Sequence, residues 1–395
     1  MNLELKELLS TKVSAIYEKI KSYREHLHQN PELSYKEFNT MEYVAAKLKE
    51  IGLPYEKGVA GTGIVSIIRS SKHSENQACI GLRADLDALP IQEQNTASYK
   101  SKVEGVMHAC GHDVHTSILL GAAEILFELR EDLEHPVKLI FQPGEEKNPG
   151  GASLLIEAGV LENPKVKEMY ALHVFPELEV GKLALRPGLN MASCDELHLE
   201  IIGVGGHGAM PEKCINPILI GSEFIIEAQN IIHKSCPKEV PCVISFGHFD
   251  ALGATNVIPE RAEIKGTFRT MNEEWREKAA ILLMDLANNL ENKYKGNVNL
   301  IVSKGYPFLK NDEELTEKLK TKFESFFGPE KIEGLALRMT SEDFSFYSQT
   351  IPVCFFRLGV GNKEKGIIYS VHHPKFDVDS ACLKTGMLAM IQAAL

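Results

Sequence analysis

The sequence predicts an α/β protein, in which a catalytic domain with a mostly parallel sheet carries an inserted α+β domain of the ferredoxin-like kind. Three observations predict this class. Strand and helix patterns alternate up to Pro187, the order then changes to β-α-β-β-α-β, and the last segment returns to helix and strand. The chain has 395 residues, and at about 150 residues per domain it is long enough for two or three domains.

The N-terminal part predicts two amphipathic helices and then a series of strands. Apolar residues recur at helical spacing over Leu3–Leu27 and Glu37–Ile51, and glycine or proline follows each pattern. A third helix is predicted over about His115–Arg130. Apolar runs bounded by turn residues predict strands over Gly63–Arg69, Ala78–Arg83, Val137–Phe141 and Glu168–His173. Strands and helices in this alternation indicate βαβ units and a mostly parallel sheet.

The segment after Pro187-Gly188 predicts a compact split-βαβ unit. Its expected elements, in order, are a strand over Leu197–Val204, a helix over Pro217–His233, strands over Val240–Phe249 and Arg261–Thr270, a helix over Glu273–Lys293 and a strand over Asn297–Ser303. The rest predicts a helix over Glu313–Phe327, a strand over Val353–Leu358 and a helix over Ser380–Ala394. This remainder is too short for an independent α/β domain. We therefore expect residues 1–188 and 305–395 to form one domain, with residues 189–304 inserted.

Composition and charge narrow the possible partners and location. The chain has 43 Lys and Arg against 54 Asp and Glu, a net charge of −11, which disfavours nucleic acid and anionic membranes as main partners. No apolar run approaches the ~18 residues of a membrane span, and the N-terminus has no apolar core of the signal-peptide type. We expect a cytoplasmic protein. Eight cysteines without a CxxC pair do not indicate a disulfide scaffold.

The densest group of chemically active residues is His108–His115. Cys110 and His112 are two residues apart, so in an extended or looped backbone their side chains leave the same face. A thiolate and an imidazole together suit a divalent ion such as Zn, Mn, Co or Ni. The alternative is a histidine-rich loop that opens the next helix, with Asp113 as its cap.

Further candidates stand at the ends of other apolar strands. Glu145 and Glu146 follow one strand, although a buried strand end normally avoids two adjacent carboxylates. His173 ends another strand, and His372 precedes a polar loop. The alternatives are a solvated turn and a core histidine. Because the carboxyl ends of strands in an open α/β sheet converge on one crevice, a shared metal site is the stronger interpretation.

Several longer motifs resemble those of the M20 metallopeptidase family, in its aminoacylase, hippurate hydrolase and auxin-conjugate hydrolase branch. They occur in the family order and extend over essentially the whole chain. The motifs are Arg24–Ser34, Arg83–Pro90, Met107–Asp113, Gln142–Glu146, Ala171–His173, Gly206–Pro211, Asn256–Pro259, Gly266–Thr270, Ser341–Phe344 and His372–Pro374.

The resemblance implies a role for each matching residue. Five residues fall on the family's positions for the ligands of two divalent metal ions: Cys110, His112, Glu146, His173 and His372. Glu145 matches the general acid/base, Asp85 the acidic residue that supports the metal site, and His207 the histidine that reaches the scissile carbonyl. Asn256 and Arg269 resemble positions near the substrate carboxylate. At the last metal position His373 is the alternative, but the His-x-Pro pattern favours His372.

The resemblance also implies an activity and an assembly. The expected enzyme is a dinuclear metal-dependent amidohydrolase that cleaves the amide bond of small N-acyl-L-amino acids, with Glu145 as general base. Alternatives within the same chemistry are an N-acetyldiaminopimelate deacetylase and a metallo-dipeptidase or carboxypeptidase. An inactive metal-dependent binding module is a further alternative, which the filled ligand positions disfavour. A homodimer is expected through the inserted lid, because the family's histidine at the position of His207 commonly comes from the neighbouring subunit.

Overall fold

The computed structural model describes residues 3–395 and divides the chain into two compact units. Unit 1 comprises the chain up to Asn190 together with Lys310–Ala336 and Asp343–Leu395. Unit 2 comprises Met191–Leu309 and Leu337–Glu342. Each unit has a hydrophobic core of its own.

Unit 1 is built on an eight-stranded sheet. In spatial order its strands are β1 (Tyr55–Val59), β2 (Gly63–Ile68), β4 (Val137–Gln142), β3 (Cys79–Asp85), β5 (Val166–Glu179), β16 (Val353–Gly361), β6 (Leu183–Leu185) and β15 (Ile332–Gly334). The central strands β4, β3, β5 and β16 are parallel. Every residue of β3, β4 and β16 is buried, as expected for parallel strands covered on both faces. The predicted α/β class is therefore confirmed.

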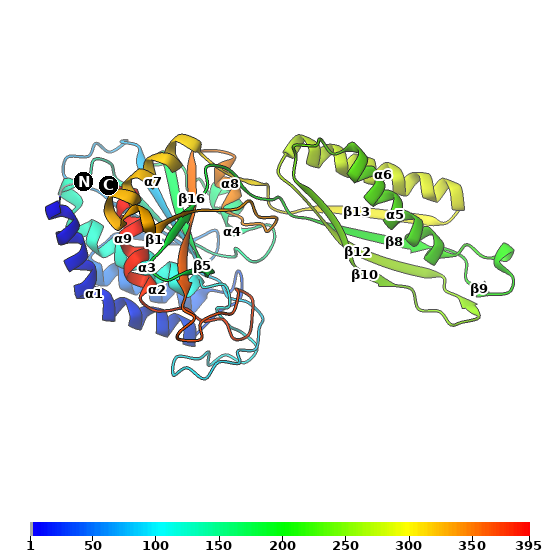
Figure 1. Cartoon of the computed structure of the whole chain (residues 1–395), viewed down its shortest axis with the longest axis horizontal. Helices are drawn as coiled ribbons and strands as arrows, with labels where there is room; N and C mark the ends of the chain where they lie inside the picture. The colour runs from blue at the N-terminus through cyan, green and yellow to red at the C-terminus, as the bar shows by residue number, and fades with distance from the viewer. Residues whose placement is uncertain (1–2) are drawn as a thin grey trace. The chain divides into compact units, whose positions relative to one another are not determined.

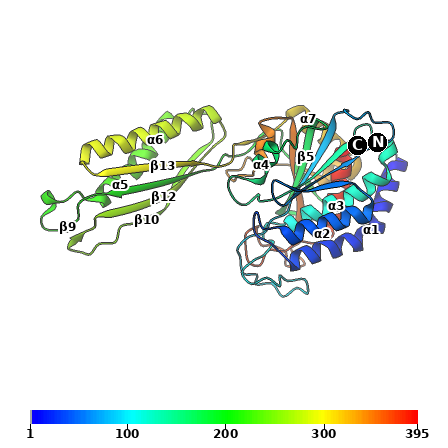
Figure 2. The same ribbon diagram turned by 180° about the vertical axis from the view of Figure 1, so that it is seen from behind.

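Helices cover both faces of this sheet. The helices α1 (Leu3–Gln29), α2 (Phe38–Ile51), α3 (His112–Glu128) and α9 (Cys382–Ala394) lie together on one side, and the short α4 (Gly151–Glu157) and α8 (Ser345–Ser348) lie on the other (Figures 1 and 2). Helix α7 (Glu313–Phe327) packs against α9 and β16. The first and last helices both contact α3, so segments from opposite ends of the chain enclose the helix that opens with His112.

Unit 2 is a four-stranded antiparallel sheet with two helices. The elements follow the chain as β8 (Asp195–Ile202), α5 (Pro217–Ser235), β10 (Cys242–Asp250), β12 (Arg261–Thr270), α6 (Glu273–Tyr294) and β13 (Asn297–Lys304), and the spatial strand order is β10-β12-β8-β13. Phe224, Phe268 and Trp275 are buried between helices and sheet. This order and topology confirm the predicted ferredoxin-like unit.

Two small sheets complete the architecture. One pairs β9 (Gly206–His207) with β11 (Val257–Ile258), and the other pairs β7 (Gly188–Met191) with β14 (Leu309–Asn311). Across residues 3–395, no helix combines the length and the apolar character that a membrane span requires.

Some elements differ from those predicted. The short strands β1, β6 and β15 and the helix α4 were not predicted, and β5 continues past His173 to Glu179. Helix α3 begins at His112 rather than at about His115, because Gly111 adopts a left-handed conformation (φ 85°) from which the helix starts directly. The earlier start places His112 on the first turn of the helix.

Candidate metal centre

The candidate residues of unit 1 gather at one edge of the large sheet. Strands β3 and β4 run parallel with Asp85 opposite Gln142, so the segments that follow them leave the sheet side by side. Glu145 and Glu146 follow β4, while His173 lies within the neighbouring β5. Helix α3 contributes His112 from its N-terminal end.

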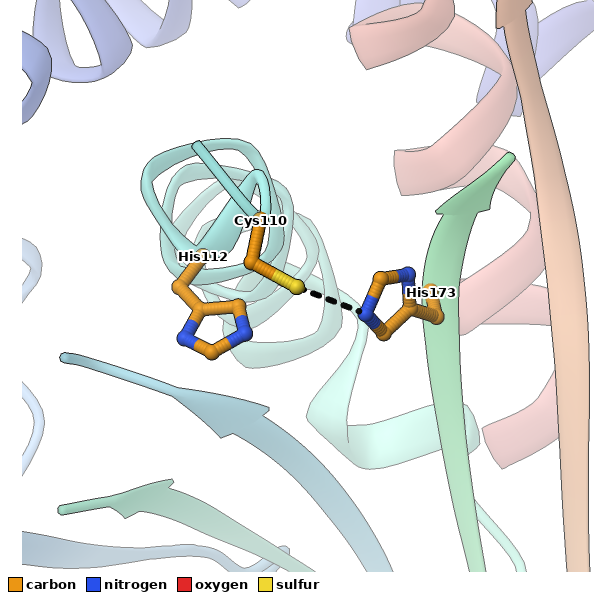
Figure 3. Close-up of side chains that lie close together, drawn as sticks. All are labelled: Cys110, His112 and His173. Carbon is orange, nitrogen blue, oxygen red and sulfur yellow. Dashed lines mark hydrogen bonds between the residues drawn. The ribbon is translucent and has the colours of Figure 1, made fainter. Parts of the chain in front are cut away.

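Cys110, His112 and His173 form the first group with the spacing of metal ligands. Their ligand atoms lie within 4.8 Å of one another and all three residues are buried. The Cys110 thiol points between the two imidazole rings, and its Sγ lies 3.4 Å from His173 Nε2 (Figure 3). Cys110 lies in the loop before α3, His112 is the first residue of that helix, and His173 lies on β5.

Hydrogen bonds at the far side of each ring orient both imidazoles. His173 Nδ1 donates to Val174 O at 2.8 Å, which leaves the Nε2 lone pair facing Cys110. His112 Nδ1 lies 3.1 Å from Asp87 Oδ1, while its Nε2 is buried without a hydrogen-bond partner. A carboxylate or carbonyl behind the imidazole is the arrangement that fixes metal-binding histidines. The residues present therefore fit a divalent metal ion.

A second group shares the thiol of Cys110 and adds Glu146 and His372. Glu146 Oε1 lies 3.1 Å from His372 Nε2, and His372 N–H donates to Ala109 O at 2.8 Å. The neighbouring His373 faces elsewhere, because its ring stacks on Tyr369. Of the two candidate histidines, it is His372 that joins the cluster.

The electrostatics of the cluster favour a bound cation. Burial and the carboxylates of Glu146, Glu145 and Asp85 hold the pKa of the Cys110 thiol well above its ordinary value. Burial lowers the pKa of His112, but Asp85 and Asp87 outweigh it and raise this pKa to about 10. A divalent ion would supply the positive charge that stabilises the thiolate, and its binding would release the protons of both groups.

Asp85 bonds mainly to His115 and Arg83, which lie beside the candidate ligands. Its Oδ1 lies 2.6 Å from His115 Nδ1, and its Oδ2 accepts a hydrogen bond from Arg83 Nη1 at 2.7 Å. Asp85 Oδ2 lies 3.6 Å from His112 Nε2. His115 Nε2 in turn accepts the N–H of Val174 at 3.0 Å, so its proton lies on Nδ1 and is donated to Asp85.

Asp87, which the motif analysis did not single out, is the carboxylate that links the two ligand groups. Its Oδ1 faces His112, and its Oδ2 accepts the N–H of Glu146 at 3.0 Å and the hydroxyl of Ser34 at 2.6 Å. Burial raises the pKa of Asp87, but the hydrogen bond and charge of His112, together with the hydrogen bonds from Ser34 and the N–H of Glu146, lower it below its ordinary value. The sequence feature that could have identified Asp87 is its position two residues after Asp85, at the end of a buried strand.

Glu145 lies beside the ligand groups. Its side chain is buried, and its Oε1 accepts the N–H of Asp343 at 3.3 Å. Ligand atoms of His112, Glu145 and Glu146 lie within 4.8 Å of one another. Asp343 itself is held by Arg83 and Gln142.

The remaining candidates belong to unit 2. His207 on β9 pairs with Val257 on β11, and Asn256 O accepts the N–H of Gly208 at 2.8 Å, so His207 and Asn256 lie on one small two-stranded element. Arg269 lies on β12, where its Nη1 donates to Met339 O at 3.2 Å. The structure thus brings His207 and Asn256 together but places Arg269 on a different sheet.

Comparison with known proteins identifies the family. The model of peptidase family M20/M25/M40 matches residues 81–394. Thermostable carboxypeptidase 2 of Saccharolobus solfataricus is 36% identical over 98% of this chain and 97% of its own length. N-acetyl-L-cysteine deacetylase of Bacillus subtilis is 34% identical over 94% and 86%. IAA-amino acid hydrolase ILR1-like 4 of Arabidopsis thaliana is 38% identical over 92% and 82%.

A solved structure supports the same relationship. The YxeP protein of Bacillus subtilis, described as a dinuclear metal binding peptidase from the M20 family, superposes with a TM-score of 0.80 at 29% sequence identity, covering 96% of this chain and 98% of that one. The chain is therefore a hydrolase of peptidase family M20/M25/M40.

Proposed function

We propose that this hydrolase is a dinuclear metal-dependent amidohydrolase that cleaves the amide bond of N-acyl-L-amino acids. The observation that carries the proposal is the buried group of Cys110, His112 and His173, in which hydrogen bonds at both Nδ1 atoms turn both Nε2 atoms toward the thiol. The names of the deacetylase and the IAA-amino acid hydrolase support an N-acyl amino acid as substrate.

Two ions would share the thiolate of Cys110. His112 and His173 would complete one ligand set, and Glu146 and His372 the other. Thiolate, imidazole and carboxylate together suit zinc, manganese, cobalt or nickel. When bound, such ions polarise an amide carbonyl and lower the pKa of water enough for it to act as a nucleophile near neutral pH.

Glu145 is the residue proposed to move the proton. It is buried beside the ligand groups, and the N–H of Asp343 holds its Oε1. As general base, Glu145 accepts a proton from the attacking water while the new carbon–oxygen bond forms. It then donates that proton to the amide nitrogen as the carbon–nitrogen bond breaks, which restores the carboxylate and releases the amine.

His207 is proposed to stabilise the oxyanion. Its Nδ1 accepts the N–H of Ala209 at 3.1 Å, so the neutral ring carries its proton on Nε2 and can donate it in a hydrogen bond. A donor aimed at the developing oxyanion lowers the barrier of acyl transfer. We assign Arg269 and Asn256 to the free carboxylate of the substrate, for which the planar guanidinium is well suited.

A homodimer through unit 2 belongs to the same proposal. Helices α5 and α6 expose large apolar side chains, among them Leu219 (58% exposed), Ile226 (60%) and Ile281 (55%). Mixed dimers test whether His207 acts in the neighbouring subunit. If it does, combining inactive His207→Ala and Glu145→Gln subunits restores one complete site per dimer, whereas action within one subunit restores none.

The activity is tested by the release of free amino acid from N-acetyl, N-benzoyl and N-acetyldiaminopimelate substrates. The protein is first treated with a chelator, and manganese, zinc or cobalt is then restored. We expect hydrolysis to depend on the metal and to be lost in Glu145→Gln with its metal content unchanged. His373→Ala is the matched control for His372→Ala. We expect His372→Ala to lose metal and His373→Ala to keep the metal content of the wild type. No hydrolysis by protein that holds two ions would refute the proposed substrate class.

A carboxypeptidase is the second candidate, because thermostable carboxypeptidase 2 is similar over almost the whole chain. N-blocked dipeptides with a free C-terminal carboxylate belong in the same panel. A preference for these dipeptides over N-acyl amino acids would select this reaction, which uses the same catalytic residues.

A further inference from the structure

A buried arginine of the first helix connects the two segments that carry His112 and His372. Arg24 on α1 is 2% exposed. Its Nε donates to Asp113 Oδ2 at 2.8 Å, and its Nη2 donates to Asp377 Oδ1 at 3.0 Å. Asp113 directly follows His112 on α3, and Asp377 closes the loop that begins with His372.

The loop over residues 372–377 needs external contacts to hold its position. It contains neither helix nor strand, and His372 has a positive φ of 65°. A hydrogen bond from Tyr99 reaches Asp377 Oδ2 at 2.7 Å, and the Tyr99 ring lies 4.5 Å from the guanidinium carbon of Arg24. The arginine, the tyrosine and the aspartate therefore form one packed contact at the end of this loop.

The charges of this contact explain why it is specific. A buried guanidinium is unfavourable unless carboxylates compensate it, and here Asp113 and Asp377 do so on two sides. The planar fork of arginine offers separate N–H groups in fixed directions, so one side chain can hold two carboxylates at a set separation. The single ammonium of lysine cannot reproduce this geometry.

We propose that Arg24 is a positioning residue of the metal centre. It holds the loop of His372 at the separation from α3 that lets both ligand groups around Cys110 form together. The inference rests on the proposed dinuclear site. Helix α1 supplies none of the candidate ligands. Its role in this proposal is to align ligands that come from two distant parts of the chain.

Arg24→Lys is the test, because it keeps the positive charge and removes the fork. We expect this variant to keep the ion of the group with His112 and His173 and to bind the ion of the group with His372 about 10- to 100-fold more weakly, the range for lost outer-shell partners. The measurement is metal content by mass spectrometry after dialysis against graded chelator, with calorimetric titration of the metal-free protein. Tyr99→Phe should weaken the same ion by a smaller factor.

Arg276→Lys in unit 2 is the matched control. Arg276 is 3% exposed and donates its Nε to Asp195 Oδ2 at 2.8 Å, so it is a similarly buried, ion-paired arginine in the unit that carries none of the candidate metal ligands. We expect it to lower stability and leave both metal affinities unchanged. If Arg24→Lys does not fold, Asp377→Asn and Tyr99→Phe test the same contact from its other side.

The outcomes separate this inference from the proposed function. Two ions bound by the wild type, with one weakened in Arg24→Lys or Asp377→Asn, support the positioning role. Two ions bound with wild-type affinity by these variants, or an equal weakening of both ions, overturn it while the dinuclear site stands. A wild type that binds no second ion overturns the proposed site and this inference with it.

Discussion

Gly111, between Cys110 and His112, is the residue whose replacement should most clearly disturb the start of α3. Its backbone is left-handed (φ 85°, ψ 18°). A Cβ added there would lie 2.5 Å from Val174 Cγ2 and 3.3 Å from Val174 Cγ1. Gly111→Ala therefore combines backbone strain with a collision against the strand that carries His173.

The expected loss follows from these two terms. The left-handed conformation costs a residue with a Cβ about 1–2 kcal/mol, and overpacking of a buried site costs about 1–3 kcal/mol. We expect Gly111→Ala to lower the free energy of unfolding of the metal-free protein by about 2–5 kcal/mol. Denaturant titration followed by far-UV circular dichroism measures it. Trp275, the single tryptophan, lies in unit 2, so its fluorescence reports that unit separately.

Gly159→Ala is the control for strain alone. Gly159 has a similar φ of 81°, and a Cβ there would meet nothing within 4 Å. The Gly159→Ala variant should lose only the backbone contribution. If the collision is real, Gly111→Ala should cost less stability in a Val174→Ala background than in the wild type. Equal losses in Gly111→Ala and Gly159→Ala, or the same cost of Gly111→Ala with and without Val174→Ala, would refute the proposed collision.

Two further predictions concern the surroundings of the cluster. Asp87→Ala should weaken metal binding about 10- to 100-fold, measured by competition with a chelator, because His112 loses the carboxylate that orients its ring. The second concerns His28. Burial and the charge of Arg24 lower the pKa of this histidine, but Asp113 and Glu93 raise it more strongly. Since the folded pKa lies above the unfolded value of about 6.5, His28 should stabilise the metal-free protein fully below that pH and progressively less as the pH rises through the folded pKa.

Each of these predictions has a matched check. Ser34→Ala removes a hydroxyl donor to Asp87 but leaves His112 in place, so a metal affinity as low as that of Asp87→Ala would contradict the orienting role. For His28, denaturant titrations of the wild type and His28→Asn are compared across pH. If both lose stability equally as the pH rises above 6.5, the dependence has another source.

The sequence predicted the elements that have strong periodicity and missed those that do not. The long amphipathic helices and the apolar core strands were recognised, and so was the β-α-β-β-α-β order of unit 2. Strand β1 was missed because most of its residues are exposed and show no alternation. Helix α4 has seven residues and begins at the second of two adjacent glycines, which normally indicate a loop.

The sequence predicted which side chains gather at the candidate site, but it did not predict the residues that hold them in place. Motifs of the family selected Cys110, His112, Glu146, His173 and His372, and the structure groups these side chains. The partners behind them depend on tertiary structure. Arg24 and Asp377 stand 353 residues apart in the chain, so a single sequence gives no reason to pair their charges.

The place of β16 in the large sheet sets an order for folding during synthesis. This strand lies between β5 and β6, yet it leaves the ribosome only after the whole of unit 2. The four-stranded sheet and both helices of unit 2 precede β16 in the chain, so unit 2 can fold while β5 still exposes an unpaired edge. Such an edge is prone to pair with other chains. Because His372 also follows β16, the complete candidate ligand set can assemble only after unit 2 and β16 have been synthesised.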